Sequence, residues 1–113
     1  MSSVDNSLDA LAERAYNTAV AHGFHEYIPN YHGDVRDVRH ILSLLMLVTT
    51  EVAEAAEAVR NGLQLEQFAA ELADIIIRTI DCAEALGLDI EGAVLSKMKK
   101  NADRSFRHGG KRA

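Results

Sequence analysis

The sequence predicts an all-α protein, a four-helix antiparallel bundle of a single domain. Apolar residues recur at three- and four-residue intervals along four stretches of the 113 residues, and no strand-like alternation persists. The one proline, Pro29, falls between the first two stretches. The later connections are short, and short connections between long helices favour antiparallel neighbours.

The first helix is expected over residues 7–22, followed by a loop from about residue 24 to 34. Gly23 suits the position just after a helix, where the backbone turns left-handed. Pro29 and Gly33 interrupt any helical pattern in the loop. The apolar stripe of this helix consists of Leu8, Leu11, Ala15, Ala19 and Val20.

The second and third helices are expected over residues 34–60 and 65–86. Asp34 is a suitable N-cap for the second helix, and Asn61-Gly62 is the clearest turn signal in the chain. Both helices are rich in aliphatic residues, and those of the second helix cover more than one stripe. We therefore expect the second helix to be buried on more than one side.

Gly87 and Leu88 predict the end of the third helix, and Asp89 is the expected N-cap of a fourth helix that reaches about residue 106. A flexible basic tail is expected from about residue 107, within a single domain of residues 1–113. Helices that are apolar on more than one side often need a partner subunit, so we expect a homodimer or homotetramer. The residues of the fourth helix that should face inward are Ile90, Val94, Leu95 and Met98.

Composition points to a globular cytoplasmic protein. Apolar residues make up 48% of the chain and charged residues 26%, and no apolar run approaches the ~20 residues of a membrane span. The N-terminus lacks the basic and apolar segments of a signal peptide. The lone Cys82 cannot form an intramolecular disulfide, and we expect it in the core.

Charge is distributed unevenly along the chain. The net charge is −5, yet seven of the 12 basic residues lie from Lys97 onward, against one acid, Asp103. An acidic body with a basic end suits a metal-bridged polyanion such as a nucleoside triphosphate. A solvated basic end that binds nothing is the alternative. Nucleic-acid binding is disfavoured, because the basic residues are confined to a short tail.

Two pairs of acids have identical spacing: Glu51 with Glu54, and Glu71 with Asp74. A three-residue interval places both members of a pair on one helix face. In a hairpin turning at Asn61-Gly62, Glu51 faces Asp74 and Glu54 faces Glu71. Four like charges in one interface repel unless a cation lies between them, so the pattern predicts a divalent metal site. One such pair alone is typical of a solvated face.

The ligand types favour a hard cation. Carboxylate oxygens suit Mg²⁺, or else Mn²⁺, whereas zinc more often recruits His or Cys. Di-iron bundle proteins use Glu-x-x-His motifs, and neither pair contains a histidine. Mg²⁺ also favours sites made of a few carboxylates, water and substrate phosphates.

The two acidic motifs, Glu51-Val-Ala-Glu54 and Glu71-Leu-Ala-Asp74, together with the closing stretch from Lys97 to Lys111, resemble the MazG-like all-α nucleotide pyrophosphohydrolases. The resemblance covers most of the chain. Thr50 stands where that family has a further glutamate, which leaves a second metal or a supporting carboxylate in question.

The resemblance implies Mg²⁺-dependent hydrolysis of a nucleoside triphosphate to a monophosphate and pyrophosphate. It also implies that Glu51, Glu54, Glu71 and Asp74 bind metal. Glu54 is our choice for the residue that orients the attacking water. The loop after the first helix contains no motif strong enough to assign a preference for base or sugar.

Lys97, Asn101 and Arg104 recur at three- to four-residue intervals, and we assign them to phosphate or sugar contact. The alternative is an ordinary solvated helix end stabilised by the helix dipole. Arg78 and Asp81 are expected to form a structural salt bridge. The competing function is a non-catalytic helical module for oligomerisation or nucleotide binding. A pyrophosphatase acting on a phosphoribosylated nucleotide is a third possibility.

Overall fold

The computed structural model describes residues 4–25 and 38–104, which form four helices and no strand. The predicted all-α fold is therefore confirmed. Asp34, the expected start of the second helix, and the expected end of the fourth near residue 106 lie outside the described residues. The helices are α1 Leu8–Ala21, α2 Val38–Arg60, α3 Leu65–Ala85 and α4 Ile90–Ala102.

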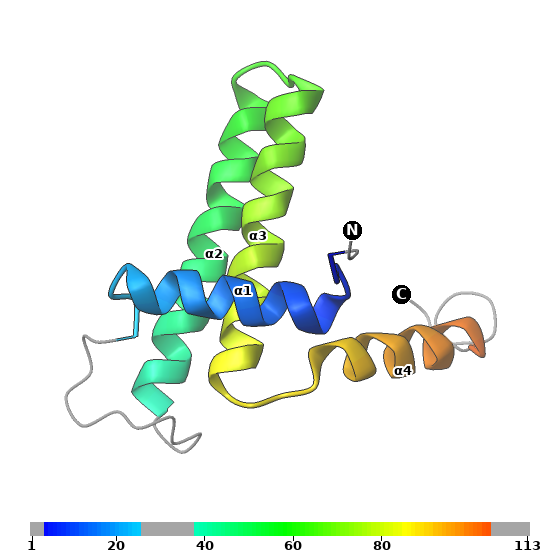
Figure 1. The fold of residues 1–113 in the computed structure, drawn as a ribbon. Coiled ribbons are helices and arrows are strands. Elements are labelled where there is room, and N and C mark those ends of the chain that lie inside the picture. Colours follow the sequence, from blue (N-terminus) through cyan, green and yellow to red (C-terminus); the bar gives the residue numbers. More distant parts are fainter. Residues whose placement is uncertain (1–3, 26–37, 105–113) are drawn as a thin grey trace.

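The central unit is the antiparallel hairpin of α2 and α3, which run side by side along their lengths (Figure 1). The predicted turn lies between them, and Gly62 adopts a φ of +98°, a conformation that side chains with a Cβ rarely adopt. Helix α1 lies across the hairpin and packs mainly on α3. Helix α4 extends away from the base of the hairpin.

Local capping explains where the helices begin. Ser7 Oγ accepts a hydrogen bond from the backbone N–H of Ala10 at 3.2 Å, and Asp89 Oδ1 accepts one from Gly92 at 3.0 Å. Each bond satisfies an N–H group that the first helical turn leaves unpaired. The cap expected at Asp89 is thus present.

Two glycines end helices α1 and α3 in the same way. Gly23 has a φ of +81° and Gly87 a φ of +70°. The residue after each glycine donates its N–H back across the last turn, Phe24 to Ala19 at 3.0 Å and Leu88 to Ala83 at 2.9 Å. This is the Schellman arrangement that the sequence predicts after the third helix.

The core of the single chain is small. Most of its side chains are those of alanine, which allows α1 to approach the hairpin closely, and Leu44 and Ile80 are its two larger apolar residues. The buried apolar residues are Ala12, Ala19, Leu44, Ala55, Ile80 and Ala83.

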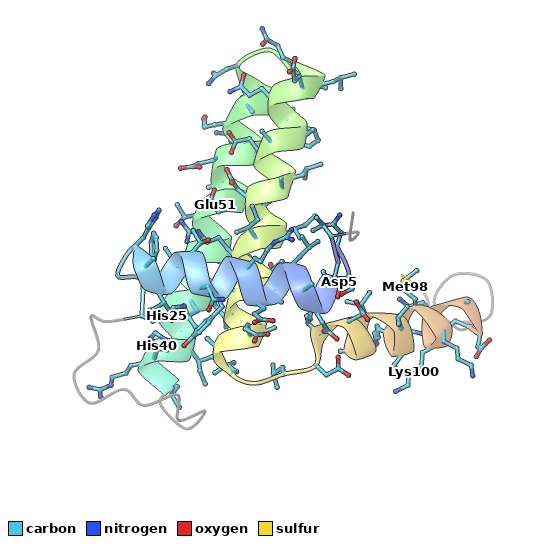
Figure 2. All side chains as sticks on the ribbon, viewed as in Figure 1. Asp5, His25, His40, Glu51, Met98 and Lys100 are labelled. Atoms are coloured by element: carbon cyan, nitrogen blue, oxygen red, sulfur yellow. The ribbon has the colours of Figure 1, made fainter. Side chains whose placement is uncertain are left out.

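A buried polar network joins the end of α1 to α2 and α3, and Figure 2 labels two of its members, His25 and His40. His25, just beyond α1, places its Nε2 2.9 Å from Asp81 Oδ1 of α3 and its Nδ1 3.2 Å from His40 Nε2 of α2. The centroid of the Tyr16 ring lies 5.0 Å from that of the His25 ring. With the Nε2–H of His25 donating to the Asp81 carboxylate, its Nδ1 is left to accept from His40.

Helix α4 contributes no buried residue, so the prediction that its apolar side faces inward is wrong for the single chain. The reason is that α4 is tethered at its beginning. Glu91 Oε1 accepts from the backbone N–H groups of Leu8 and Asp9, at 2.8 and 3.3 Å, and so caps α1 from another helix. Beyond this contact the helix leaves the body, and Val94, Leu95 and Met98 are exposed.

Helix α2 also exposes apolar residues that were expected to be covered, among them Leu42, Met46 and Val52. On α3, Leu72, Ile76 and Ile77 are exposed as well. None of the described helices combines the length and apolar character needed to cross a membrane.

Candidate metal centre

Three carboxylates converge in the α2–α3 hairpin. Glu51 of α2 and Glu71 and Asp74 of α3 each offer an oxygen, and these oxygens lie within 4.8 Å of one another. The three-residue interval aligns Glu71 with Asp74, and the antiparallel register brings Glu51 opposite them. We call Glu51, Glu71 and Asp74 the acidic cluster; Figure 2 shows Glu51 in the body of the hairpin.

Glu54, the fourth predicted ligand, lies outside the group of three but beside Glu51. The pKa of Glu51 is raised, first because the carboxyl is buried, and then because of the charge of Glu54 and a side-chain hydrogen bond with it. The charge of Asp74 raises that pKa further, while Arg78 lowers it. Glu54 itself is exposed, so it combines contact with the cluster and access to water.

Two oxygens of the acidic cluster are buried without a hydrogen-bond partner among the described residues, Glu51 Oε2 and Glu71 Oε2. A buried oxygen with unused lone pairs is costly unless something satisfies it. The donors are all hard oxygens, without nitrogen or sulfur, which are the preferred ligands of Mg²⁺ and Mn²⁺. The residues present thus fit a divalent cation.

Arg78 lies next to the acidic cluster, with its Nε 3.6 Å from Glu51 Oε1. Its guanidinium carbon stands 4.3 Å from the centre of the Phe24 ring. The expected salt bridge between Arg78 and Asp81 is wrong, because each residue has another partner. Asp81 is buried and turns to His25, whereas Arg78 extends toward α2.

Thr50 stands where the resemblance implies a further glutamate. Its Oγ1 donates to the backbone carbonyl of Met46 at 3.0 Å, as threonine commonly does within a helix. Thr50 and Glu54 lie together in a shallow hollow of about 390 Å³ near the tip of the hairpin. Thr50 therefore adds no carboxylate to the acidic cluster.

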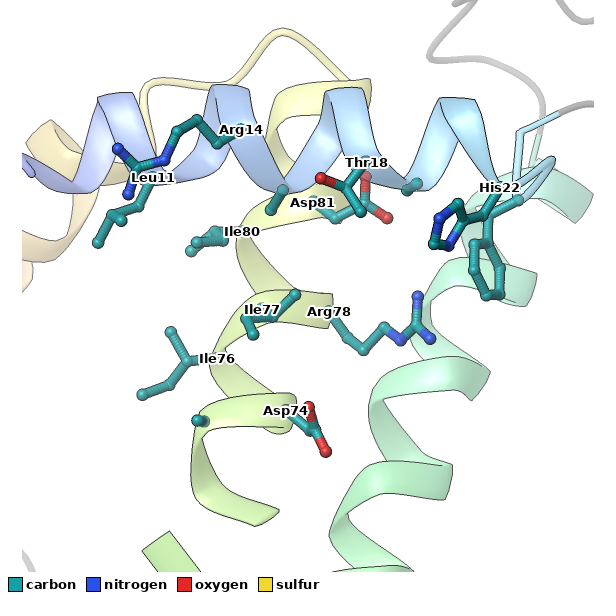
Figure 3. Close-up of a pocket in the computed structure, with 14 residues that line it drawn as sticks. Leu11, Arg14, Thr18, His22, Asp74, Ile76, Ile77, Arg78, Ile80 and Asp81 are labelled. Carbon is teal, nitrogen blue, oxygen red and sulfur yellow. The ribbon is translucent and has the colours of Figure 1, made fainter. Parts of the chain in front are cut away.

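A larger cavity of about 470 Å³ adjoins the acidic cluster, between α1 and α3 (Figure 3). Two residues connect the cavity to the acidic cluster: Asp74, a member of the cluster, and Arg78, which contacts Glu51, both line the cavity wall. The rest of the wall is mainly apolar, with a polar edge formed by Arg14, Thr18 and His22. A ligand held at the cluster would therefore have an apolar recess beside it.

The predicted phosphate-binding residues Lys97, Asn101 and Arg104 are all exposed on or just after α4. None of them lines either cavity. Because α4 extends away from the hairpin, one chain does not bring these residues to the acidic cluster. Figure 2 shows their neighbours Met98 and Lys100 far out along that helix.

Sequence reasoning missed the contact between His25 and His40, because nothing in their spacing suggested that they meet. One signal was available. His40 precedes the buried Leu44 by four residues, on the same face of α2, where a histidine needs a polar partner.

Fold and site together define an all-α protein with a carboxylate centre suited to a hard divalent cation. The chain belongs to the family of MazG nucleotide pyrophosphohydrolase domains, whose family model matches residues 39–107. The match spans α2, α3 and α4, including both acidic motifs, and it confirms the resemblance noted in the sequence. No curated protein and no solved structure matches the chain.

Proposed function

We propose that this protein is a Mg²⁺-dependent nucleotide pyrophosphohydrolase, which converts a nucleoside triphosphate to a monophosphate and pyrophosphate. The observation that carries the proposal is the acidic cluster with its two unpartnered buried oxygens, inside a domain of the MazG family. Mn²⁺ has the same preference for oxygen and is the expected substitute.

In this proposal Glu51, Glu71 and Asp74 hold the cation, and Glu54 assists from its place beside Glu51. A bound Mg²⁺ would bind phosphate oxygens and offset the negative charge that builds up on them. The exposed Glu54 carboxylate orients the attacking water and accepts its proton. The water oxygen bonds to the α-phosphorus as the bond between this atom and the oxygen that bridges the α and β phosphates breaks. The leaving pyrophosphate keeps the bridging oxygen and the electrons of that bond.

We further propose that the protein assembles as a homodimer or homotetramer, and that Lys97, Asn101 and Arg104 bind phosphate within this assembly. The exposed apolar residues of α2, α3 and α4 support the assembly, since a second copy would remove them from water. The distance of α4 from its own acidic cluster supports the second part, because a neighbouring copy can supply the basic residues that the single chain keeps apart.

The test is a panel of ribo- and deoxynucleoside triphosphates incubated with Mg²⁺ and followed by release of pyrophosphate. We expect Glu54→Gln and Asp74→Asn to lower kcat by about 100-fold or more, the scale of losing a positioned proton acceptor or metal ligand. Glu66→Gln is the matched control, an exposed acid of α3 outside the cluster, and should retain wild-type activity.

Activity in the two variants equal to that of the wild type would refute the proposal. Nucleotide binding without turnover by the wild-type protein would instead support the non-catalytic binding module.

A further inference from the structure

Arg78 is the basic residue that contacts the acidic cluster within the described residues. Its Nε is 3.6 Å from Glu51 Oε1, and the two side chains are only 23% and 14% exposed. This separation is longer than the 2.7–3.2 Å of an ordinary N–H···O hydrogen bond. The two groups form a long ion pair in a partly buried position, where the interaction between charges is stronger than at the exposed surface.

The position of Arg78 does not depend on the acidic cluster alone. The face of Phe24 supports the guanidinium at 4.3 Å, within the range of a cation–π interaction. Phe24 is in turn fixed by the turn that ends α1, where its N–H bonds to the Ala19 carbonyl at 3.0 Å. Arg78 can therefore leave Glu51 and still be held next to the cluster.

The charges around Glu51 are unbalanced in the metal-free protein. One oxygen from each of three carboxylates lies within 4.8 Å of the others, and in the described part of the chain a single guanidinium approaches one of these carboxylates. A divalent cation brings twice the charge and binds carboxylate oxygens directly, at distances near 2 Å for Mg²⁺. Arg78 approaches Oε1 of Glu51 and leaves Oε2 without a partner, so a cation that binds both oxygens competes with Arg78 for this carboxylate.

We propose that Arg78 is the counter-ion of the acidic cluster in the metal-free protein, and that an incoming divalent cation takes Glu51 from it. This inference rests on the proposed function, because it takes the cluster to be the metal centre. After the exchange Arg78 remains on Phe24, where it lines the wall of the larger cavity as a cation without its carboxylate. Metal binding thereby makes a positive group available to an anionic ligand beside the centre.

The first test measures binding of Mg²⁺ and Mn²⁺ alone by calorimetry. Arg78→Gln should bind both cations more tightly, by about tenfold, because a unit charge that repels and competes with the metal is gone. Arg78→Lys keeps the charge and should stay close to the wild type. Arg14→Gln is the matched control for charge, since Arg14 lines the same cavity but bonds to Asp5 and Asn6.

The second test measures thermal stability, first without metal and then with it. In metal-free protein Arg78→Gln should lower the melting temperature, and the loss should be much smaller when Glu51 is already Gln, because only the contact with Phe24 is then removed. Saturating Mn²⁺ should also remove most of the loss of melting temperature, because the bound cation then offsets the charge of the carboxylates in place of Arg78. An arginine with a merely structural role would lower the melting temperature equally with and without metal.

The outcomes separate the two proposals. Unchanged or weaker metal binding by Arg78→Gln, in a wild type that binds metal, overturns the exchange but leaves the metal centre standing. A wild type that binds neither cation overturns the proposed metal centre. An effect of Arg78→Gln on melting that is the same in both Glu51 backgrounds overturns the counter-ion role by itself.

Discussion

At the scale of single residues, Glu51 joins the acidic cluster to two further charged groups. It is the one acid of α2 in the acidic cluster, and it contacts Glu54 on its own helix and Arg78 on the other. Burial and neighbouring acids raise its pKa above the ordinary 4.5, so its ionised form is disfavoured in spite of Arg78. The cluster thus holds a charge that the fold itself does not stabilise.

A dependence of stability on pH follows from this raised pKa. Below the ordinary pKa of glutamate, Glu51 is protonated in both the folded and unfolded protein and costs nothing. As pH rises, the unfolded chain ionises first, so metal-free protein loses stability until the pH has passed the raised pKa. Urea unfolding in the presence of a chelator, followed from acidic to neutral pH, should show this decline.

Glu51→Gln should remove much of the decline and should be more stable than wild type at neutral pH without metal. With saturating Mg²⁺ the order should reverse, because the variant lacks a ligand. Parallel declines with pH in the wild type and Glu51→Gln would rule out this origin.

The acidic cluster could be predicted from sequence because it depends on two local regularities, the helical interval and the turn at Asn61-Gly62. The partners of Arg78 could not. Arg78 and Asp81 are three residues apart on α3, which made a mutual salt bridge the simplest expectation. Their actual partners, Glu51 and His25, come from other parts of the chain, and no local rule selects them.

At the scale of helices, the contact between α4 and α1 depends on a single carboxylate. Glu91 of α4 accepts two backbone N–H groups at the start of α1, where the positive end of the helix dipole also favours a negative charge. Ser7 supplies the local cap at the same end. The beginning of α1 is therefore capped both from its own sequence and from a distant helix.

Glu91→Ala should destabilise the protein by about 1 kcal/mol, the usual cost of removing a helix cap. Urea unfolding gives the overall change, and hydrogen exchange should show faster exchange of the Leu8 and Asp9 amides. Glu66→Ala is the matched control, because Glu66 is also the second residue of its helix, without such a bond. Equal effects of the two substitutions would mean that the long-range cap contributes nothing.

The sequence predicts helix ends well, because caps and glycines act over a few residues. It does not predict the direction of α1 or of α4. The crossing of α1 over the hairpin depends on small buried residues such as Ala12 and Ala19 meeting α3, and the course of α4 depends on Glu91 reaching across to Leu8. Both are contacts between residues far apart in the chain.

At the scale of the whole molecule, the single chain leaves much of its apolar surface in water. Leu42 and Met46 of α2 are 57% and 62% exposed, and Ile76 of α3 is 54% exposed. Large exposed apolar side chains on two adjacent helices favour association with a further copy.

Light scattering during size-exclusion chromatography should give the mass of a dimer or tetramer for the wild type. Leu42→Glu should shift the mass toward that of a monomer while retaining its helical content, because the side chain is exposed in the single chain. Leu65→Glu, also exposed but at the start of α3, should remain assembled. A monomeric wild type at micromolar concentration would contradict the expected assembly.

The network of His25, His40 and Asp81 brings distant parts of the chain together. His25 and His40 are separated by fifteen positions, yet their ring nitrogens are 3.2 Å apart and both rings are buried. Asp81 of α3 also bonds to His25, so the end of α1, the start of α2 and the later part of α3 meet at one buried point. A substitution at any one of the three residues therefore acts on three helices at once, however far apart those helices lie in the sequence.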